Sequence, residues 1–399
     1  MKLRDSANIF VSSLTAPKTI ELVESELSKK KKKPGSTWCL DNSLSPADLY
    51  TYLKARFGPP NGTMMIVRSP STDNFIQWHY TLKSGKEFID IMGMNTRTEI
   101  WISGYKGLSL EDWHSLVKAI KDDFKKYGSK MKEVRKSLEK WKLFYSPYNR
   151  LERVINKYSQ ELNDLNIDAL ELPSDPKVKP LLHPDKKNAF SDIHDYLRLM
   201  TEYREKYSRA QELSICLRLL SPVWGEAFVN FIIFMLARSE IKNDNRLYQD
   251  YLRSDIDVRI KLLHIKCDHF MKPIDNSSKA FKAFHTLMNE RNNLLHGNVD
   301  LNKLAYETIY FDDTIPLFTE PQSLGKVALE NSLKGIEASK SIECVDLVRS
   351  FIKHVLECIS PETRKFVKLL LEKRDLGWRE ETKRIGDLFD DTIVEGYAR

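Results

Sequence analysis

Residues 278–297 read SKAFKAFHTLMNERNNLLHG, and their pattern decides how the second half of the chain is expected to fold. Apolar side chains recur in this stretch at the three- and four-residue spacing of one helix face: Phe281, Phe284, Met288 and Leu295. Gly297 can adopt the left-handed conformation that ends many helices. The spacing therefore predicts a helix over residues 277–296 with one face buried against other helices.

Arg291 falls on that apolar face, three residues after Met288 and four before Leu295. A guanidinium removed from water needs an acidic or polar partner, because an unpaired buried charge costs several kcal/mol. The adjoining face of the same helix carries a polar row: His285, Asn289, Asn292 and His296. The arginine, the amide and a histidine at a helix C-terminus are groups suited to phosphodiester chemistry.

The surrounding residues 189–378 have the same helical character, which predicts an all-α bundle. Their most apolar run, residues 223–237 (VWGEAFVNFIIFMLA), is interrupted by Glu226 and Asn230. The run is shorter than the ~20 apolar residues that a membrane span needs, so we interpret it as a buried helix. Other helices are predicted over 221–239, where Ser221-Pro222 supplies the start, over 246–269, and within 325–373.

Residues 1–106 are expected to form a small α+β domain. Ser45-Pro46 predicts the start of a helix that ends before Gly58. Four short strands are predicted after it, with a hairpin at Ser84-Gly85: 64–67, 75–82, 87–91 and 99–102. The fold class expected from the whole sequence is therefore an α+β domain followed by an all-α bundle, mainly α overall.

A basic helical connector is expected over residues 107–188. Its first helix begins at the N-cap Ser109, and further helix is predicted over 130–145 and 148–165. Four prolines between residues 172 and 184 predict the linker that ends the connector. Residues 379–399 are expected to be a C-terminal tail.

Composition indicates a globular protein of the cytoplasm. The 399 residues include 63 Lys+Arg and 56 Asp+Glu, giving a net charge of +7, with 41% hydrophobic residues. These values exclude disordered and collagen-like chains. The five cysteines are scattered without metal-ligand spacing, so neither a metal nor another cofactor is expected. The sequence has no P-loop, HExxH or GxSxG motif, which argues against P-loop nucleotide hydrolases, zinc proteases and serine hydrolases.

The run Arg291-Asn292-Asn293-Leu294-Leu295-His296 resembles the signature of the HEPN superfamily, in which an arginine and a polar residue precede a histidine. The resemblance covers about residues 190–375 and implies an all-helical domain. Many HEPN domains are metal-independent ribonucleases of bacterial toxin, abortive-infection and other antiviral defence systems. It therefore implies an endoribonuclease that binds RNA and needs no cofactor.

The resemblance also implies a role for each candidate residue. His296 would act as general acid or base, Arg291 would neutralise charge on the reacting phosphate, and Asn292 would orient the phosphate or His296. Glu226, with Asn230 beside it, is expected to be the acidic partner of Arg291. Because HEPN sites are commonly shared between two protomers, a homodimer through the C-terminal domain is expected.

Two other segments have the same arginine-to-histidine spacing: Arg259–His264 (RIKLLH) and Arg349–His354 (RSFIKH). The spacing alone therefore does not select a site. Residues 291–296 are preferred because only they combine an amide after the arginine, a polar row on the helix and a glycine after the histidine.

Several features have a second, purely structural interpretation. His296 and Asn292 could be ordinary surface residues at a helix end, and Glu226 and Asn230 could be core hydrogen-bonding groups. Trp78, Tyr80, Trp101 and Tyr105 could stack bases, although a hydrophobic core is the favoured interpretation. Two groups of basic residues could contact RNA or simply be solvated: the run Lys29, Lys30, Lys31, Lys32, Lys33, and the residues Lys125, Lys126, Lys130, Lys132, Arg135, Lys136, Lys140 and Lys142.

Two hypotheses follow from the sequence. The first is a cytoplasmic endoribonuclease whose N-terminal domain senses a trigger or binds an antitoxin, with no membrane association. The second is a HEPN-type module without catalytic activity that dimerises and binds RNA or a partner protein.

Overall fold

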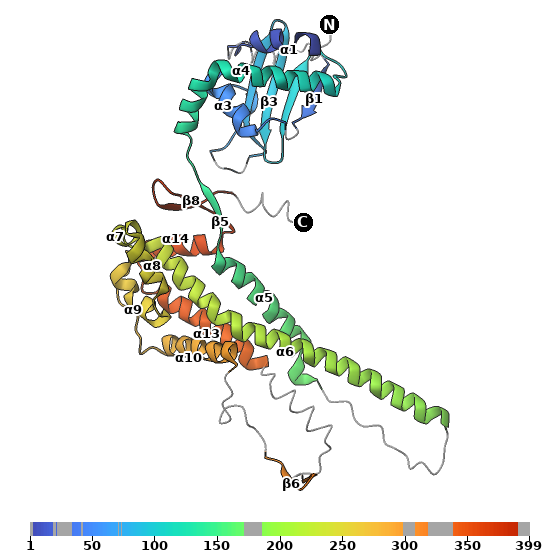
Figure 1. The fold of residues 1–399 in the computed structure, drawn as a ribbon, viewed down its shortest axis with the longest axis vertical. Helices are drawn as coiled ribbons and strands as arrows, with labels where there is room; N and C mark the ends of the chain where they lie inside the picture. Colours follow the sequence, from blue (N-terminus) through green and yellow to red (C-terminus); the bar gives the residue numbers. More distant parts are fainter. Residues whose placement is uncertain are drawn as a thin grey trace. The chain divides into compact units, whose positions relative to one another are not determined.

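The computed structural model describes residues 3–18, 21, 34–40, 43–70, 72, 74–170, 186–297, 308–317 and 338–389 (Figure 1). An α+β region with an antiparallel sheet precedes a mainly helical part, and 61% of the chain is helical, which confirms the expected fold class. The chain forms two compact units. Unit 1 is Met1–Leu143 with Gly377–Arg399, and unit 2 is Phe144–Leu376.

Unit 1 is built on a four-stranded antiparallel sheet with the order β1-β4-β3-β2. The strands are β1 (Gly35–Cys39), β2 (Ile76–Ser84), β3 (Glu87–Met94) and β4 (Thr98–Ser103). Ser84 pairs with Glu87, so Gly85 and Lys86 form the hairpin turn, and Gly85 has the positive φ of 58° that such a turn requires. Helices α1 (Leu3–Ser12), α3 (Pro46–Phe57) and α4 (Leu110–Ser137) cover one face (Figure 1).

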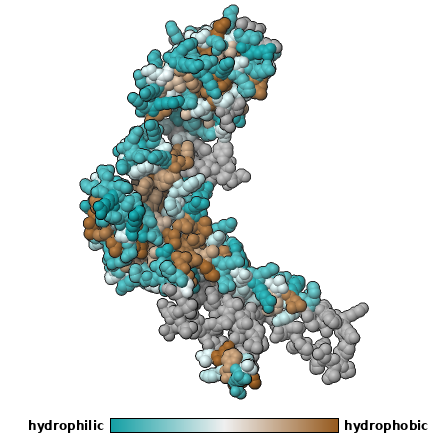
Figure 2. Space-filling view, in the orientation of Figure 1, coloured by the Kyte–Doolittle hydropathy of each residue, from teal (hydrophilic) through white to brown (hydrophobic). Residues whose placement is uncertain are grey.

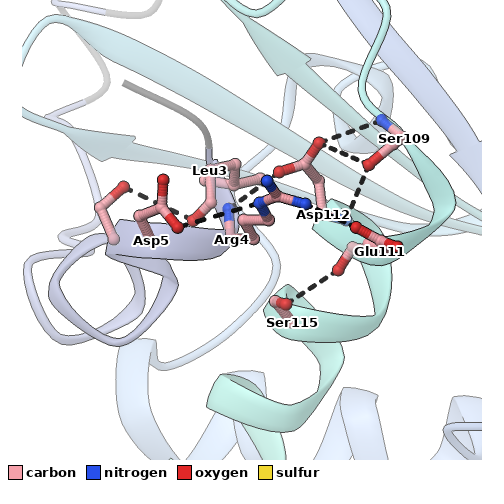
Figure 3. A network of polar contacts seen from close by, with 8 residues as sticks. Leu3, Arg4, Asp5, Ser109, Glu111, Asp112 and Ser115 are labelled. Carbon is pink, nitrogen blue, oxygen red and sulfur yellow. Dashed lines mark hydrogen bonds and ion pairs between the residues drawn. The ribbon is translucent and has the colours of Figure 1, made fainter.

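The expected helix starts in unit 1 are confirmed. The Ser45 side chain caps α3, and Ser109 and Asp112 form a reciprocal capping box on α4. Asp112 also accepts the backbone N–H of Arg4 at 2.9 Å, which joins the start of α1 to α4 (Figure 3). Burial raises the pKa of Asp112, but the hydrogen bonds from Arg4 and Ser109 outweigh it and hold the pKa below its ordinary value.

Three of the four aromatic side chains considered for base stacking serve the core of unit 1. Tyr80 is fully buried, and Trp78 and Tyr105 pack against the same cluster, as the favoured interpretation predicted. Trp101 alternates with buried Ile100 and Ile102 and so lies on the opposite face of the sheet.

Unit 2 is organised around α6 (Lys186–Leu236), a helix of 51 residues (Figure 1). Helices α5 (Pro147–Leu165), α10 (Lys279–His296) and α13 (Ala338–Leu356) pack on α6. The other helices of this unit in the described ranges are short: α7 (Ser239–Asn243), α8 (Asn245–Arg253), α9 (Ile256–Lys266) and α14 (Pro361–Glu372). Figure 2 shows apolar side chains exposed on this unit next to hydrophilic ones.

A close approach fixes α10 on α6 and α13. The ring of Phe284 on α10 stacks on Phe351 of α13, with 4.1 Å between ring centroids. Gly225 on α6 makes room for the same ring, because a Cβ at that position would lie 2.4 Å from Phe284. The absence of a side chain at Gly225 therefore sets the distance between α6 and α10.

Pro222 does not start a helix, contrary to the prediction, but lies inside α6. A proline within a helix removes a hydrogen bond and costs about 3 kcal/mol. Leu217 and Trp224 are both buried on either side of it, so packing before and after Pro222 holds the helix together. Tertiary contacts have outweighed a local signal that normally marks a helix start.

Other element predictions need correction. Residues 64–67 are not a strand: Thr63–Met65 form a 3-10 turn, and Ile66 and Val67 are exposed. The helix expected over 130–145 ends at Ser137, and the chain then forms strand β5 (Lys142–Tyr145). The helix expected over 246–269 is divided into α8 and α9 at Ser254-Asp255.

Several further elements were not predicted from the sequence. They include α1, β1 and two strands near the C-terminus, β8 (Asp375–Arg379) and β9 (Arg384–Asp387), which form a sheet with the order β5-β8-β9. They also include a small hairpin of β6 (Tyr310–Asp312) and β7 (Ile315–Leu317) in unit 2. The expected connector is shared, with α4 in unit 1 and α5 in unit 2. The proline-rich linker at 172–184 lies outside the described residues.

Candidate functional site

The candidate site is built from α6, α9 and α10 of unit 2. The buried face of α10 carries Phe281, Phe284, Leu287 and Met288. Leu295, expected on this face, is instead 59% exposed, and Leu294 beside it is 42% exposed. The last turn of α10 therefore presents apolar side chains to solvent.

Arg291 lies on the inner side of α10, as its place in the apolar face predicted. Its side chain keeps only 19% of its surface exposed, and its Nη2 atom lies 3.9 Å from Oε2 of Glu226 on α6. The expected contact between Arg291 and Glu226 is therefore present. It is longer than a hydrogen bond.

A second arginine, which the sequence analysis had set aside, holds Glu226 more tightly. Arg259 of α9 donates from Nη2 to Oε1 of Glu226 and from Nη1 to Oδ1 of Asn230, each at 2.5 Å. The Arg259 side chain is 7% exposed. Glu226 and Asn230 lie one turn apart on α6 and together accept hydrogen bonds from a single guanidinium.

The cluster has more positive than negative charge. Two guanidinium groups surround a single carboxylate, so the group carries a formal charge of +1. The Nε atoms of Arg259 and Arg291 are both buried, and neither has a hydrogen-bond partner in the described part of the chain. An uncompensated guanidinium in a partly buried place attracts an anion.

Asn292 and His296 lie on the outer side of the same helix end. Both are exposed, and α10 ends after His296, where Gly297 adopts a φ of 59° as predicted. Five residues of helix separate Arg291 from His296 by about 140° of rotation and about 7.5 Å of rise. Arg291 therefore faces the carboxylate while His296 faces solvent.

The histidines of the other two matching segments have local contacts. His264 lies 3.1 Å from the carbonyl oxygen of Lys261. His354 lies 3.2 Å from the hydroxyl of Ser278, whose side chain caps the start of α10. Arg349 bonds Asp346 and Asn156. Of these two segments, only Arg259 reaches the candidate site.

The sequence did contain a signal for Arg259. It lies three residues after Ile256 and four before Leu263, so it occupies an apolar helix face just as Arg291 does. Arg259 is thus placed on its helix in the same way as Arg291, and its guanidinium equally needs an acidic or polar partner. The lysine run at 29–33 lies outside the described residues.

Unit 1 contains a pocket of about 750 Å³ at the start of α4, with Arg4 and Glu111 among the residues that line it. Arg4 and Glu111 form an ion pair at 2.6 Å in its wall. The polar groups drawn in Figure 3 are hydrogen-bonded to one another, so they link the start of α1 to the start of α4.

Cysteine chemistry and metal binding gain no support from the described ranges. All five cysteines are free, and burial raises the pKa of Cys267 to about 12 and that of Cys344 to about 11. Among the residues described, no group of three His, Cys, Asp or Glu side chains could hold a metal ion.

One helix in the described part of the chain, His194–Leu236 within α6, is long and apolar enough to cross a membrane. Its most apolar window is 56% buried. The core helix of a water-soluble bundle satisfies the same criterion, so length and composition do not separate the two cases.

Comparisons with known proteins gave no relatives. No protein-family model matches the sequence, and no curated protein or solved structure is significantly similar to it.

Proposed function

We propose that the chain is a metal-independent endoribonuclease of the HEPN type, with its site at the C-terminal end of α10. One observation carries the proposal. Arg291 is a partly buried guanidinium whose acidic neighbour, Glu226, is already hydrogen-bonded to Arg259. Because Glu226 is already engaged, we propose that the charge of Arg291 acts on a phosphate bound at this end of α10, where His296 is exposed.

The proposed reaction uses the RNA's own 2′-hydroxyl. His296 takes the 2′ proton as the 2′-oxygen attacks the adjacent phosphorus, and a protonated histidine gives a proton to the departing 5′-oxygen. Arg291 stabilises the additional negative charge on the phosphate in the transition state, and Asn292 donates a hydrogen bond to a phosphate oxygen. The products are a 2′,3′-cyclic phosphate and a 5′-hydroxyl.

A homodimer would supply both proton transfers. One protomer offers a single histidine in the 291–296 segment, whereas the reaction needs a base and an acid. Leu294 and Leu295 are exposed next to His296, and a second copy packed on them would bring two His296 side chains together. The composite site would lie across the two-fold axis.

The proposed setting is a bacterial toxin or antiviral defence system in the cytoplasm. Such a nuclease must be restrained until it is needed. Unit 1 is proposed to carry that restraint, by sensing a trigger or by binding an antitoxin.

A second candidate function is a HEPN-type module without catalytic activity that dimerises and binds RNA or a partner protein. The exposed Leu294 and Leu295 favour it, because an apolar helix end can serve association alone. It differs from the first candidate in requiring no proton transfer at His296.

Expression in a bacterial host separates the two. The wild-type chain should slow growth, and His296→Ala or Arg291→Ala should relieve the effect at equal soluble expression. His264→Ala is the matched control, because it removes a histidine of the same spacing outside the site and should stay as toxic as the wild type. Equal toxicity of the wild type and a folded His296→Ala protein would contradict the proposal.

A further inference from the structure

Five lysines of α4 in unit 1 lie along one side of that helix and form what we call the lysine stripe: Lys118, Lys121, Lys125, Lys132 and Lys136. At 100° per residue they fall within an arc of about 60°, and at 1.5 Å per residue they span about 27 Å. All five are exposed. The stripe is therefore a nearly straight row of positive charges.

The fold holds the stripe away from the core. The buried side of α4 carries Trp113, Leu116, Val117, Ile120 and Met131, whose directions centre roughly 120° away from the stripe. The capping box at Ser109 and Asp112 fixes the start of the helix, and the bond from Arg4 ties it to α1. The lysines thus project from a rigid support rather than from a loop.

Acidic residues form ion pairs with basic residues next to the lysine stripe, but with only one lysine of the stripe itself. Lys126 pairs with Asp123, and Arg135 pairs with Asp48. Within the stripe only Lys125 has such a partner among the described residues, Asp122 at 3.3 Å, and both side chains are largely exposed. In the part of the chain that the structure describes, no ion pair involves the other four lysines. Their charge is left for a partner outside the chain.

We infer that the lysine stripe binds the phosphate backbone of a single-stranded nucleic acid. A straight row of about 27 Å is long enough to contact several consecutive phosphates of an extended strand. Lysines that neutralise phosphates release condensed counterions, which supplies affinity without reading sequence. The inference does not depend on the proposed cleavage, because the stripe lies in unit 1 and the candidate site in unit 2.

A membrane surface and an acidic protein fit the stripe less well. A helix that binds lipid inserts an apolar face into the bilayer, and the apolar face of α4 is buried against the sheet. A stable protein interface usually has aromatic or aliphatic anchors near its centre, whereas the stripe contains only lysines with Gly128 and Ser129 near its middle.

The test uses the full chain with all five stripe lysines changed to glutamine. A charge-matched control changes five exposed lysines of unit 2 to glutamine: Lys206, Lys272, Lys353, Lys365 and Lys368. A third protein carries arginine at the five stripe positions. Fluorescence anisotropy measures binding of labelled uridine and thymidine 20-mers over a range of salt concentrations, and vesicles rich in phosphatidylserine form a separate arm.

Wild type, control and arginine variant should bind both oligonucleotides with the same salt dependence. The glutamine variant of the stripe should bind at least tenfold more weakly at low salt. Its plot of log K against log salt should be shallower by about 3.5, because each of the five phosphates that a lysine neutralises on a single strand adds ~0.7 to the slope. Unfolding temperatures should match, since the five side chains are exposed.

Several results would overturn the inference. They are no binding by the wild type, unchanged binding by the glutamine variant of the stripe, an equal loss in the unit 2 control, failure of the arginine variant to bind, or a loss limited to one of the two oligonucleotides. Vesicle binding that depends on the stripe, without oligonucleotide binding, would identify a lipid surface instead.

Discussion

Glu226 is hydrogen-bonded to Arg259 at 2.5 Å, and this bond determines how much of the carboxylate's negative charge is left for Arg291. The same carboxylate lies 3.9 Å from Arg291, so the two arginines share it unequally. Arg259 is a positioning residue, because it fixes the acid and, through Asn230, the face of α6. Arg291 is left with most of its charge uncompensated.

This inequality predicts different costs for removing the two arginines. Arg259→Met should lower the free energy of unfolding by about 2–4 kcal/mol, because Glu226 and Asn230 lose their partner inside the bundle. Arg291→Met should cost less than about 1 kcal/mol, since its contact is long. Urea unfolding of both variants checks the order. Equal losses would show that Glu226 serves both arginines alike.

Gly225 is expected to couple the packing of α10 to the site. Gly225→Ala should destabilise unit 2 by about 1–3 kcal/mol, because the new Cβ would meet the Phe284 ring at 2.4 Å and push α10 away from α6. RNA cleavage should fall with it, because Glu226 and Arg291 lie on these two helices. Gly128→Ala in α4 is the matched control. A Cβ atom at position 128 would have no neighbouring atom within 4 Å, so this variant should stabilise its helix by about 0.5–1 kcal/mol. If Gly225→Ala left the stability of unit 2 and RNA cleavage unchanged, the close approach of α6 and α10 would not be needed for the site.

Asp123 is expected to make unit 1 sensitive to acid. Burial raises its pKa, but bonds from Lys126 and Tyr52 and the charge of Arg56 outweigh burial, so the pKa lies below its ordinary value of 3.8. A carboxylate with a depressed pKa in the folded state stabilises the protein above its unfolded pKa, and this contribution is lost as the pH falls through the folded value.

The free energy of unfolding of unit 1 should therefore decrease as the pH falls below about 4. Asp123→Asn should be less stable at neutral pH and should show a flatter pH dependence in this window. Tryptophan fluorescence during urea titration at several pH values measures both effects. Parallel pH curves for the two proteins would exclude Asp123 as a source of the acid sensitivity.

The exposed end of α10 is expected to form the dimer contact. Leu295→Glu should shift the protein from dimer to monomer in sedimentation analysis, because it places a charge in an apolar interface. Leu369→Glu is the matched control, since Leu369 of α14 is 50% exposed, close to the 59% of Leu295, and lies outside the 291–296 segment. An unchanged dimer in the Leu295 variant would place the contact elsewhere.

Local signals in the sequence were sufficient for several elements. Serine caps, a proline at the first helical position and Gly297 identified the bounds of α3, the start of α4 and the end of α10, because these groups act within one turn. Pro222 was misread because buried side chains on both sides of it stabilise α6, and such tertiary packing has no local signature. Strand β1 and the pairing of β5 with β8 depend on partners far away in the chain.

The candidate site was predicted in part. Helical periodicity placed Arg291 on a buried face, and the resemblance implied Glu226, with Asn230 beside it, as its partner; the three residues do lie in one cluster. Arg259 was not predicted to lie in the site. Its segment was interpreted only as a competing arginine-to-histidine motif, and not as a source of a partner for Glu226. The exposure of Leu295 could not be derived, because periodicity predicts which face is apolar but not where the neighbouring helices end.

The central claim is tested most directly by incubating end-labelled RNA with purified protein in EDTA and identifying the ends of the products. The account predicts fragments with 2′,3′-cyclic phosphate and 5′-hydroxyl ends from the wild type and from His264→Ala, and none from His296→Ala. Cleavage by His296→Ala at the wild-type rate, or cleavage that disappears in EDTA, would contradict a metal-independent site at the end of α10.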